Sequence, residues 1–135
     1  MFELSTAISP NIKILIDDAF SLYFIDNSAC ANKIRIAIEG ILDDLKAPKK
    51  KKDKNGRLCN IPNLHQRIEN FSKKQPKICR LLMALKIIGN DGSHIGDVDT
   101  ESILDAFEIL KWLIEVTYTK NEEKIRQMAD KIINR

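Results

Sequence analysis

The sequence contains few of the residues that interrupt helices or cross-link small folds. Five glycines and four prolines among 135 residues leave room for long helices. The three cysteines, Cys30, Cys59 and Cys79, lie far apart and form no Cys-x-x-Cys pair. An odd number of dispersed cysteines argues against a disulfide framework, shows no zinc-ligand spacing and favours reduced thiols. We therefore expect a cytoplasmic protein without a metal or other cofactor.

Long apolar runs are also missing from the chain. No stretch approaches the roughly 20 apolar residues that a membrane-spanning helix needs. The amino terminus does not begin with a basic segment followed by an apolar one, so we expect no signal peptide. At 135 residues the chain is long enough for one domain with its own core. These features predict a single domain, spanning residues 1–135, that does not contact a membrane.

Apolar residues recur at spacings of three and four over most of the sequence, which predicts helices. The predicted helices span residues 9–25, 28–46, 62–73, 76–88, 100–118 and 121–133. We find no strand pattern and no internal repeat. The expected fold is all-α, an antiparallel four-helix bundle with a short extra helix at 62–73. The C-terminal segment, residues 119–135, is predicted as an amphipathic helix that docks on its own bundle or on a second chain.

Positive charge is concentrated in one segment. Residues 46–57 contain seven basic residues and one acidic residue, a net charge of +6, which leaves −3 for the rest of a chain whose total is +3. The surrounding segment, residues 46–58, contains almost no apolar residues, which predicts a mobile Lys-rich loop. Such a loop is either simply solvated or a surface that holds phosphates. The candidate nucleic-acid contacts are Lys49, Lys50, Lys51, Lys52, Lys54 and Arg57.

A polar segment, Gly89-Asn90-Asp91-Gly92-Ser93-His94, separates two of the predicted helices. Its composition predicts a tight turn, with Gly89 or Asn90 left-handed at the end of the preceding helix. His94 is a candidate acid or base, because the ordinary pKa of histidine lies near physiological pH. The alternative is structural: Ser93 and His94 then bond helix ends across the turn. The other histidine, His65, is predicted to be a surface residue.

Four short segments together resemble a known family: Asp17-Asp18-Ala19, Ala31 through Arg35 to Glu39, Leu64 with Ile68, and Gly89-Asn90 with His94. They are similar to DUF4145, a helical domain of unknown function that occurs alone or fused to restriction-enzyme and helicase subunits in bacteria. That family is placed with the HEPN superfamily of four-helix domains. The resemblance implies a HEPN-like bundle, a homodimer that brings two Asn–His turns together, and a role in bacterial defence or toxin–antitoxin systems.

The active motif of that superfamily is an Arg, then a polar residue that is often Asn, and then a His. Asn90 and His94 match the last two positions, and Gly89 stands where the Arg is expected. In metal-free RNA cleavage the His would move a proton and the Arg would stabilise charge on the phosphate. Arg35 and Arg80 are the candidates to replace the Arg. Because Arg35 and Glu39 are four residues apart, a helix-surface ion pair is the alternative role for Arg35.

Three functions remain open on the sequence. The first is an accessory or effector domain of a bacterial defence, restriction or toxin–antitoxin system, which binds nucleic acid such as RNA or a protein of that system, with weak or no catalysis. The second is a metal-independent endoribonuclease that uses His94, Asn90 and Arg35. The third is a scaffolding module without a nucleic-acid role.

Overall fold

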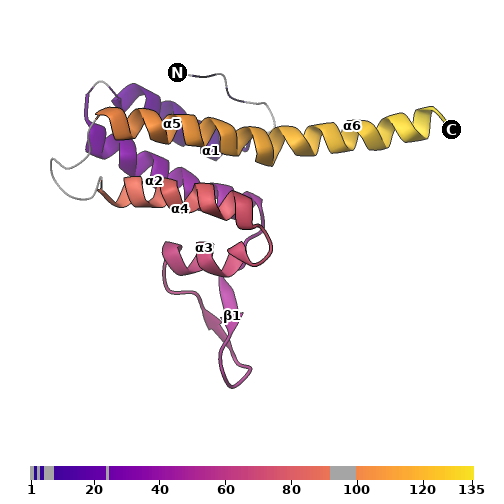
Figure 1. The fold of residues 1–135 in the computed structure, drawn as a ribbon, viewed down its shortest axis with the longest axis horizontal. Coiled ribbons are helices and arrows are strands. Elements are labelled where there is room, and N and C mark those ends of the chain that lie inside the picture. The colour runs from indigo at the N-terminus through magenta and orange to yellow at the C-terminus, as the bar shows by residue number, and fades with distance from the viewer. Residues whose placement is uncertain (1, 3, 5–7, 24, 92–99) are drawn as a thin grey trace.

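The computed structural model describes residues 2, 4, 8–23, 25–91 and 100–135, and for residues 90, 91 and 119–123 it describes the backbone alone. Within this part of the chain the elements are α1 (Pro10–Leu22), α2 (Asn27–Asp44), β1 (Lys50–Lys52), β2 (Leu58–Asn60), α3 (Leu64–Ser72), α4 (Pro76–Asp91), α5 (Thr100–Ile114), the π-helical turn η1 (Glu115–Thr119) and α6 (Lys120–Ile133) (Figure 1). The prediction of a mainly helical fold is confirmed. The finer prediction, a HEPN-like four-helix bundle, stays a prediction.

Helix α1 begins at a proline, which has no amide hydrogen to satisfy, whereas α2 and α3 begin where a side chain accepts a hydrogen bond from an amide of the first turn. Pro10 opens α1 after Ser9, as the sequence predicted. The Asp26 carboxylate accepts a hydrogen bond of 3.1 Å from the Ala29 amide and so caps α2 one residue before the predicted start. The Asn63 side chain accepts a 2.8 Å bond from the Gln66 amide and caps α3. The start of α3 is therefore fixed next to the strands.

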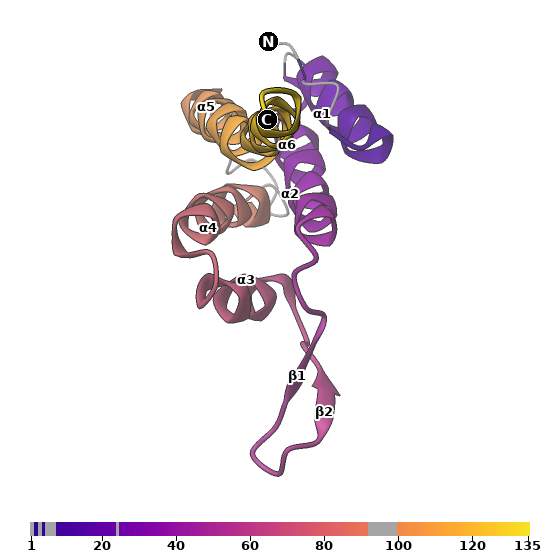
Figure 2. The same cartoon turned by 90° about the vertical axis from the view of Figure 1, so that its right-hand side faces the viewer.

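The core lies around α2, which packs between α1 and α4, while α4 also contacts α3 and α5 (Figure 2). The rings of Phe20 and Phe107 lie 5.1 Å apart and join α1 to α5. Each fully buried aliphatic side chain contributes roughly 1.5–3 kcal/mol. The largest of them are Ile12, Ile16, Ile34, Ile38, Ile41, Leu42, Ile68, Leu82, Leu85, Ile103, Leu110 and Leu113.

The Lys-rich segment forms a β-hairpin, so the prediction of a chain without strands is wrong, while the predicted mobility of this segment stays a prediction. Strands β1 and β2 pair in an antiparallel register, with Lys50 opposite Asn60 and Lys52 opposite Leu58. Backbone hydrogen bonds and a tight turn form this hairpin without buried apolar side chains. The sequence-based prediction had assumed that such burial is needed for regular structure. The hairpin extends away from the helices beyond α3 (Figure 2).

The segment that begins at Gly89 is not a turn throughout. Helix α4 continues through Gly89 and Asn90 to Asp91, so Gly89 is helical and buried, not a left-handed cap. The reason is tertiary packing: a methyl group at Gly89 would lie 2.7 Å from Cβ of Arg35 and 3.2 Å from the carbonyl oxygen of Ala31. Glycine therefore permits the close approach of α4 to α2. Gly92, Ser93 and His94 lie outside the described residues.

The last two predicted helices are joined. Helix α5, the π-helical turn η1 and α6 follow one another without a break, so Asn121 does not cap a separate helix. The hydroxyl of Tyr118, within η1, donates a 2.7 Å hydrogen bond to Asp44 at the end of α2. Beyond it α6 extends away from the rest of the molecule (Figure 1). Residues 124–135 are all exposed, so in this chain α6 does not dock on its own bundle.

Candidate nucleic-acid interface

The basic hairpin is closed by a turn that the Asp53 carboxylate organises. One oxygen of Asp53 accepts hydrogen bonds of 2.8 Å from the Asn55 amide and 2.9 Å from the Arg57 amide. Gly56 has a φ of 77°, a conformation that glycine adopts without strain. The single acidic residue of this segment therefore shapes the backbone. The predicted contact residues Lys49, Lys50, Lys51, Lys52, Lys54 and Arg57 are all exposed on this hairpin.

The base of the hairpin is fastened to the helices by Arg67 of α3. One terminal nitrogen of Arg67 donates to Asp43 of α2 and to the carbonyl oxygen of Ala47, both at 2.9 Å. Arg67 is only 9% exposed, whereas Lys49 forms a looser 3.6 Å ion pair with the same Asp43. Sequence reasoning missed this anchor. The sequence spacing could have indicated it, because Arg67 lies three residues after Leu64 and four before Phe71, which places it on the buried face of α3.

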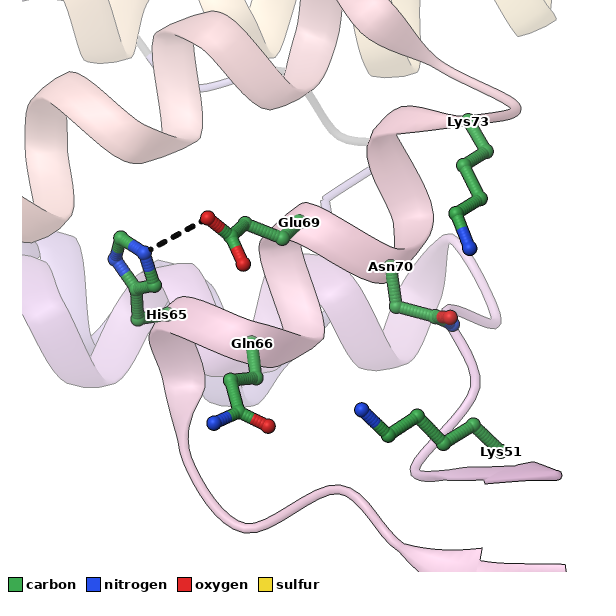
Figure 3. A pocket seen from close by; sticks show the side chains of 6 residues that line it. All are labelled: Lys51, His65, Gln66, Glu69, Asn70 and Lys73. Carbon is green, nitrogen blue, oxygen red and sulfur yellow. Dashed lines mark hydrogen bonds and ion pairs between the residues drawn. The ribbon is translucent and has the colours of Figure 1, made fainter. Parts of the chain in front are cut away.

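A groove of about 430 Å³ lies between β1 and α3 (Figure 3). Gln66, Asn70 and Lys73 are spaced at four and three residues, so they share the face of α3 that borders the groove. Lys51 reaches across from β1 towards Gln66 and Asn70 (Figure 3). Lys51 and Lys73 have no carboxylate partner within the described residues. The groove thus combines two ammonium groups with two amide side chains.

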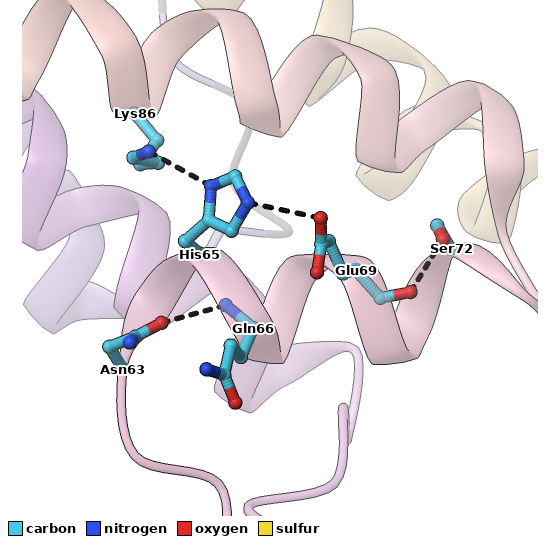
Figure 4. A network of polar contacts seen from close by, with 6 residues as sticks. All are labelled: Asn63, His65, Gln66, Glu69, Ser72 and Lys86. Atoms are coloured by element: carbon cyan, nitrogen blue, oxygen red, sulfur yellow. Dashed lines mark hydrogen bonds and ion pairs between the residues drawn. The ribbon is translucent and has the colours of Figure 1, made fainter.

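His65 is held in a polar network beside this groove (Figure 4). Its Nε2 lies 3.0 Å from Oε1 of Glu69, and the ammonium group of Lys86 lies 3.1 Å from its Nδ1. A neutral imidazole with its proton on Nε2 satisfies both contacts, donating to Glu69 and accepting from Lys86. Because its two ring nitrogens contact Glu69 of α3 and Lys86 of α4, His65 ties the two helices together.

The residues of the predicted catalytic motif are placed only in part. Arg35 of α2 lies directly beside Gly89, the residue that the superfamily resemblance aligns with the motif Arg. No Arg35–Glu39 ion pair occurs among the residues that the structure describes. Arg80 lies nine residues before Gly89 on α4, roughly 13 Å away along the helix axis. The side chain of Asn90 and the whole of His94 lie outside the described residues.

The comparisons with known proteins extend over nearly all of this architecture. Residues 17–135 match the family described as a domain of unknown function, DUF4145. The chain belongs to the DUF4145 family. The match includes the hairpin, α3 and the α2–α4 contact, and it confirms the family resemblance seen in the sequence. No curated protein and no solved structure matches the chain.

Within the described part of this DUF4145 domain, the groups with clearly shifted pKa values belong to the core. Burial raises the pKa of Cys30 to about 11, helped by the charge of Asp26, and burial alone raises that of Cys79 to about 11. The pKa of Tyr118 is raised by burial and by its hydrogen bond to Asp44. Raised pKa values keep these groups neutral near pH 7, so neither buried thiol is an activated nucleophile.

The described part of the DUF4145 domain contains neither a metal-binding cluster nor a membrane-spanning helix. Over residues 8–23, 25–91 and 100–135 there is no group of three or more His, Cys, Asp or Glu side chains suited to a metal ion. In the same part of the chain, every helix is too short or too polar to cross a membrane.

Proposed function

We propose that this DUF4145 domain binds nucleic acid through its basic hairpin, as a cytoplasmic accessory or effector domain of a bacterial defence, restriction or toxin–antitoxin system, with weak or no catalysis. The observation that carries the proposal is the hairpin itself. It presents six exposed basic side chains on a hydrogen-bonded scaffold that projects from the helices (Figure 2). The link to defence systems comes from the family resemblance.

The order of the hairpin strengthens the case for binding phosphates. A mobile loop would lose conformational entropy when it binds, whereas a preformed hairpin has already lost most of it. The remaining chain carries a net charge of −3, so the strongest concentration of positive charge that an incoming polyanion meets along the sequence is the hairpin segment. Lysines contact phosphates without reading sequence, which predicts affinity that depends little on sequence and strongly on salt.

The test replaces hairpin lysines and compares them with lysines elsewhere. The triple variant Lys50→Gln, Lys52→Gln and Lys54→Gln removes exposed charges from the hairpin. Its matched control replaces Lys13, Lys111 and Lys124, which are exposed on α1, α5 and α6. Fluorescence anisotropy with labelled RNA and DNA measures the affinity across a series of salt concentrations.

We expect the hairpin variant to bind at least tenfold more weakly. The slope of log affinity against log salt concentration should become less steep by roughly 0.7–0.9 for each phosphate contact that is lost. The control should bind like the wild type. Equal losses in both variants would show that the hairpin is not the binding surface. Affinity that does not depend on salt, or no binding at all, would favour the scaffolding function.

The exposed apolar face of α6 supports a homodimer. Ile125, Met128 and Ile132 recur at three and four residues, so they share one face, and each is at least 60% exposed. In an antiparallel pair centred between Met128 and Ala129, Ile125 of one copy lies opposite Ile132 of the other. This face is therefore self-complementary, as a two-fold interface requires. Sedimentation should show a wild-type dimer and a monomeric Ile125→Glu, Ile132→Glu variant; a monomeric wild type would contradict the proposal.

Arg35 supports a second candidate, the metal-independent ribonuclease. Its backbone lies beside Gly89, so a guanidinium is available next to the position where the superfamily motif has its Arg. Asn90 follows directly on α4. In this candidate, His94 transfers the proton and Arg35 stabilises the phosphate charge. Cleavage of labelled RNA in the presence of a chelator distinguishes it from the binding function.

A further inference from the structure

We infer that the pocket at the base of the hairpin binds a guanine base of single-stranded nucleic acid. This inference rests on the proposed function and adds to it the base that the domain reads. The pocket lies where the end of α2, the hairpin and the start of α3 meet (Figure 2). Its volume of about 460 Å³ falls within the range of small-molecule sites. Its charged lining residues are Glu39, Asp43, Lys49 and Arg67.

Arg67 is a buried guanidinium with unused hydrogen-bond donors. The residue is only 9% exposed. Both hydrogen bonds of its side chain, to Asp43 and to the carbonyl oxygen of Ala47, start from the same terminal nitrogen, Nη2. Its Nε is buried and has no partner within the described residues. A buried donor without an acceptor is costly, so Arg67 favours a ligand that brings an acceptor to the pocket that it lines.

Glu39 places an unpaired carboxylate in the same pocket. It is half-buried and lies one helical turn before Asp43 on the same face of α2. Asp43 contacts Arg67 at 2.9 Å and Lys49 at 3.6 Å, whereas Glu39 forms no ion pair within the described residues. An ionised carboxylate only accepts hydrogen bonds. A matching ligand therefore brings donors to Glu39 and acceptors to Arg67.

Guanine is the base whose edges match this arrangement. Its N1–H and N2–H groups are adjacent donors, which the two oxygens of one carboxylate can accept together, as they accept the fork of an arginine. Unpaired uracil, cytosine and adenine each present one donor group with an acceptor beside it, and a carboxylate repels that acceptor. On its other edge, guanine presents O6 and N7, the acceptor pair that arginine and lysine bind. The carboxylate of Glu39 thus distinguishes guanine from the other three bases.

The position of the pocket suits a strand that is held by the hairpin. Lys49 and Asn60 line the pocket, and the Ile61 amide donates a 2.8 Å hydrogen bond to the carbonyl oxygen of Lys49 at the base of the hairpin. A strand whose phosphates follow the hairpin lysines therefore leads towards this pocket. In a duplex, N1 and N2 of guanine are paired, so only a single strand exposes the donors that Glu39 accepts.

The experiment compares oligo(rU) strands of equal length that carry a central rG, rA or rC, by fluorescence anisotropy at one salt concentration. The wild type should bind the rG strand about tenfold more tightly than the other two, the effect of one bidentate base contact. Glu39→Gln exchanges a carboxylate oxygen for an amide NH₂ group and should bind the three strands alike, with an unchanged salt dependence. Its matched control, Glu108→Gln at an exposed position on α5, should keep the preference.

A strand with a central inosine locates the contact within the base. Inosine lacks the N2 amino group of guanine, so the wild type should bind it more weakly than rG, and Glu39→Gln should bind both alike. Equal affinity of the wild type for rG, rA and rC, equal affinity for rG and inosine, or a preference that survives in Glu39→Gln would overturn the inference while hairpin binding still stands. Absence of any binding by the wild type would overturn both. Thermal melting confirms that each variant is folded.

Discussion

Helix α4 contacts α3 and α2 in different ways. The buried face of α3 shares the core with α4, but the two helices also meet in an exposed polar contact between His65 and Lys86, and the adjoining hairpin and groove remain open to solvent. Towards α2 the contact is close and dry, because Gly89 allows the two backbones to approach. An open polar contact can accept a ligand, whereas a contact that excludes a single methyl group cannot accept a new side chain. The comparison therefore favours binding at the hairpin over restoring the motif Arg at position 89.

The largest expected effect is on the open side, at the hairpin anchor. Arg67→Ala removes the hydrogen bonds to Asp43 and Ala47 and leaves a buried carbonyl oxygen without its donor. We expect the free energy of unfolding to fall by about 3 kcal/mol, as measured by urea denaturation. The matched variant Arg57→Ala changes an exposed hairpin arginine and should cost less than about 0.5 kcal/mol.

The binding affinity of Arg67→Ala sharpens this result. If Arg67 positions the hairpin, the folded variant should also bind RNA more weakly, although Arg67 itself is buried. Unchanged stability would show that the α2–α3 contact does not depend on this guanidinium. Unchanged affinity would show that the hairpin binds independently of its base.

The next effect tests the close side. Gly89→Ala should lower the free energy of unfolding by about 1–2 kcal/mol, because overpacking against the Ala31 carbonyl and Arg35 outweighs the helix propensity that alanine adds. Gly40→Ala is the matched helical control. A methyl group there meets Cγ1 of Ile12 at 2.8 Å, a side-chain atom that can move aside. Equal melting temperatures of the Gly89→Ala and Gly40→Ala variants would show that Gly89 is not required by packing against α2.

Periodicity in the sequence predicted most of the helices because burial determines them. The helix over 10–22 and the one over 27–44 follow apolar stripes that the structure buries. The hairpin was missed because Lys50–Lys52 shows no alternation of apolar and polar residues, and all three side chains are exposed. The available signal was Asp53 with Asn55-Gly56, a turn pattern that sets a hairpin without a core.

The candidate site was predictable by charge but not by geometry. The lysines of residues 49–54 were identified from composition, and the structure adds the groove that Gln66 and Asn70 form with Lys51. Such a groove depends on the register between a strand and a helix, which spacing alone does not reveal. Gly89 was read as a helix end because local propensity favours it there. The approach of α2, a tertiary contact, keeps it helical.

A smaller effect concerns the two buried thiols of the core. Cys30 lies in α2 and donates to the carbonyl oxygen of Ala19, and Cys79 lies near the start of α4. Their pKa values are raised from 9.0 to about 11, so the folded state holds the protons more tightly than the unfolded chain. The resulting stability is complete below pH 9 and is lost as pH rises towards 11.

Between pH 8 and pH 10, each buried thiol should therefore contribute a loss of about 1 kcal/mol. Cys30→Ala and Cys79→Ala should each reduce the pH-dependent loss by that amount, measured by urea denaturation at both pH values. Cys59→Ala, on β2 outside the core, should leave it unchanged. A pH dependence that neither core variant changed would contradict the raised pKa values of the two thiols.

The smallest expected effect is on RNA cleavage. A ribonuclease of the superfamily type needs a proton-transfer group and a guanidinium at the phosphate, and Gly89 lacks the second. Arg35 lies beside Gly89, but its backbone belongs to the close α2–α4 contact, not to an open groove. We expect no measurable metal-free cleavage of a labelled single strand by the wild type, and hence no change in His94→Ala or Arg35→Ala. The opposite result would be robust cleavage in chelator by the wild type and by Arg80→Ala, with no cleavage by His94→Ala or Arg35→Ala and with unchanged melting temperatures. That result would contradict the expectation that the α2–α4 contact takes no part in function. The close side of α4 would then be the active one, with Arg35 in place of the missing Arg and the hairpin delivering the strand to it.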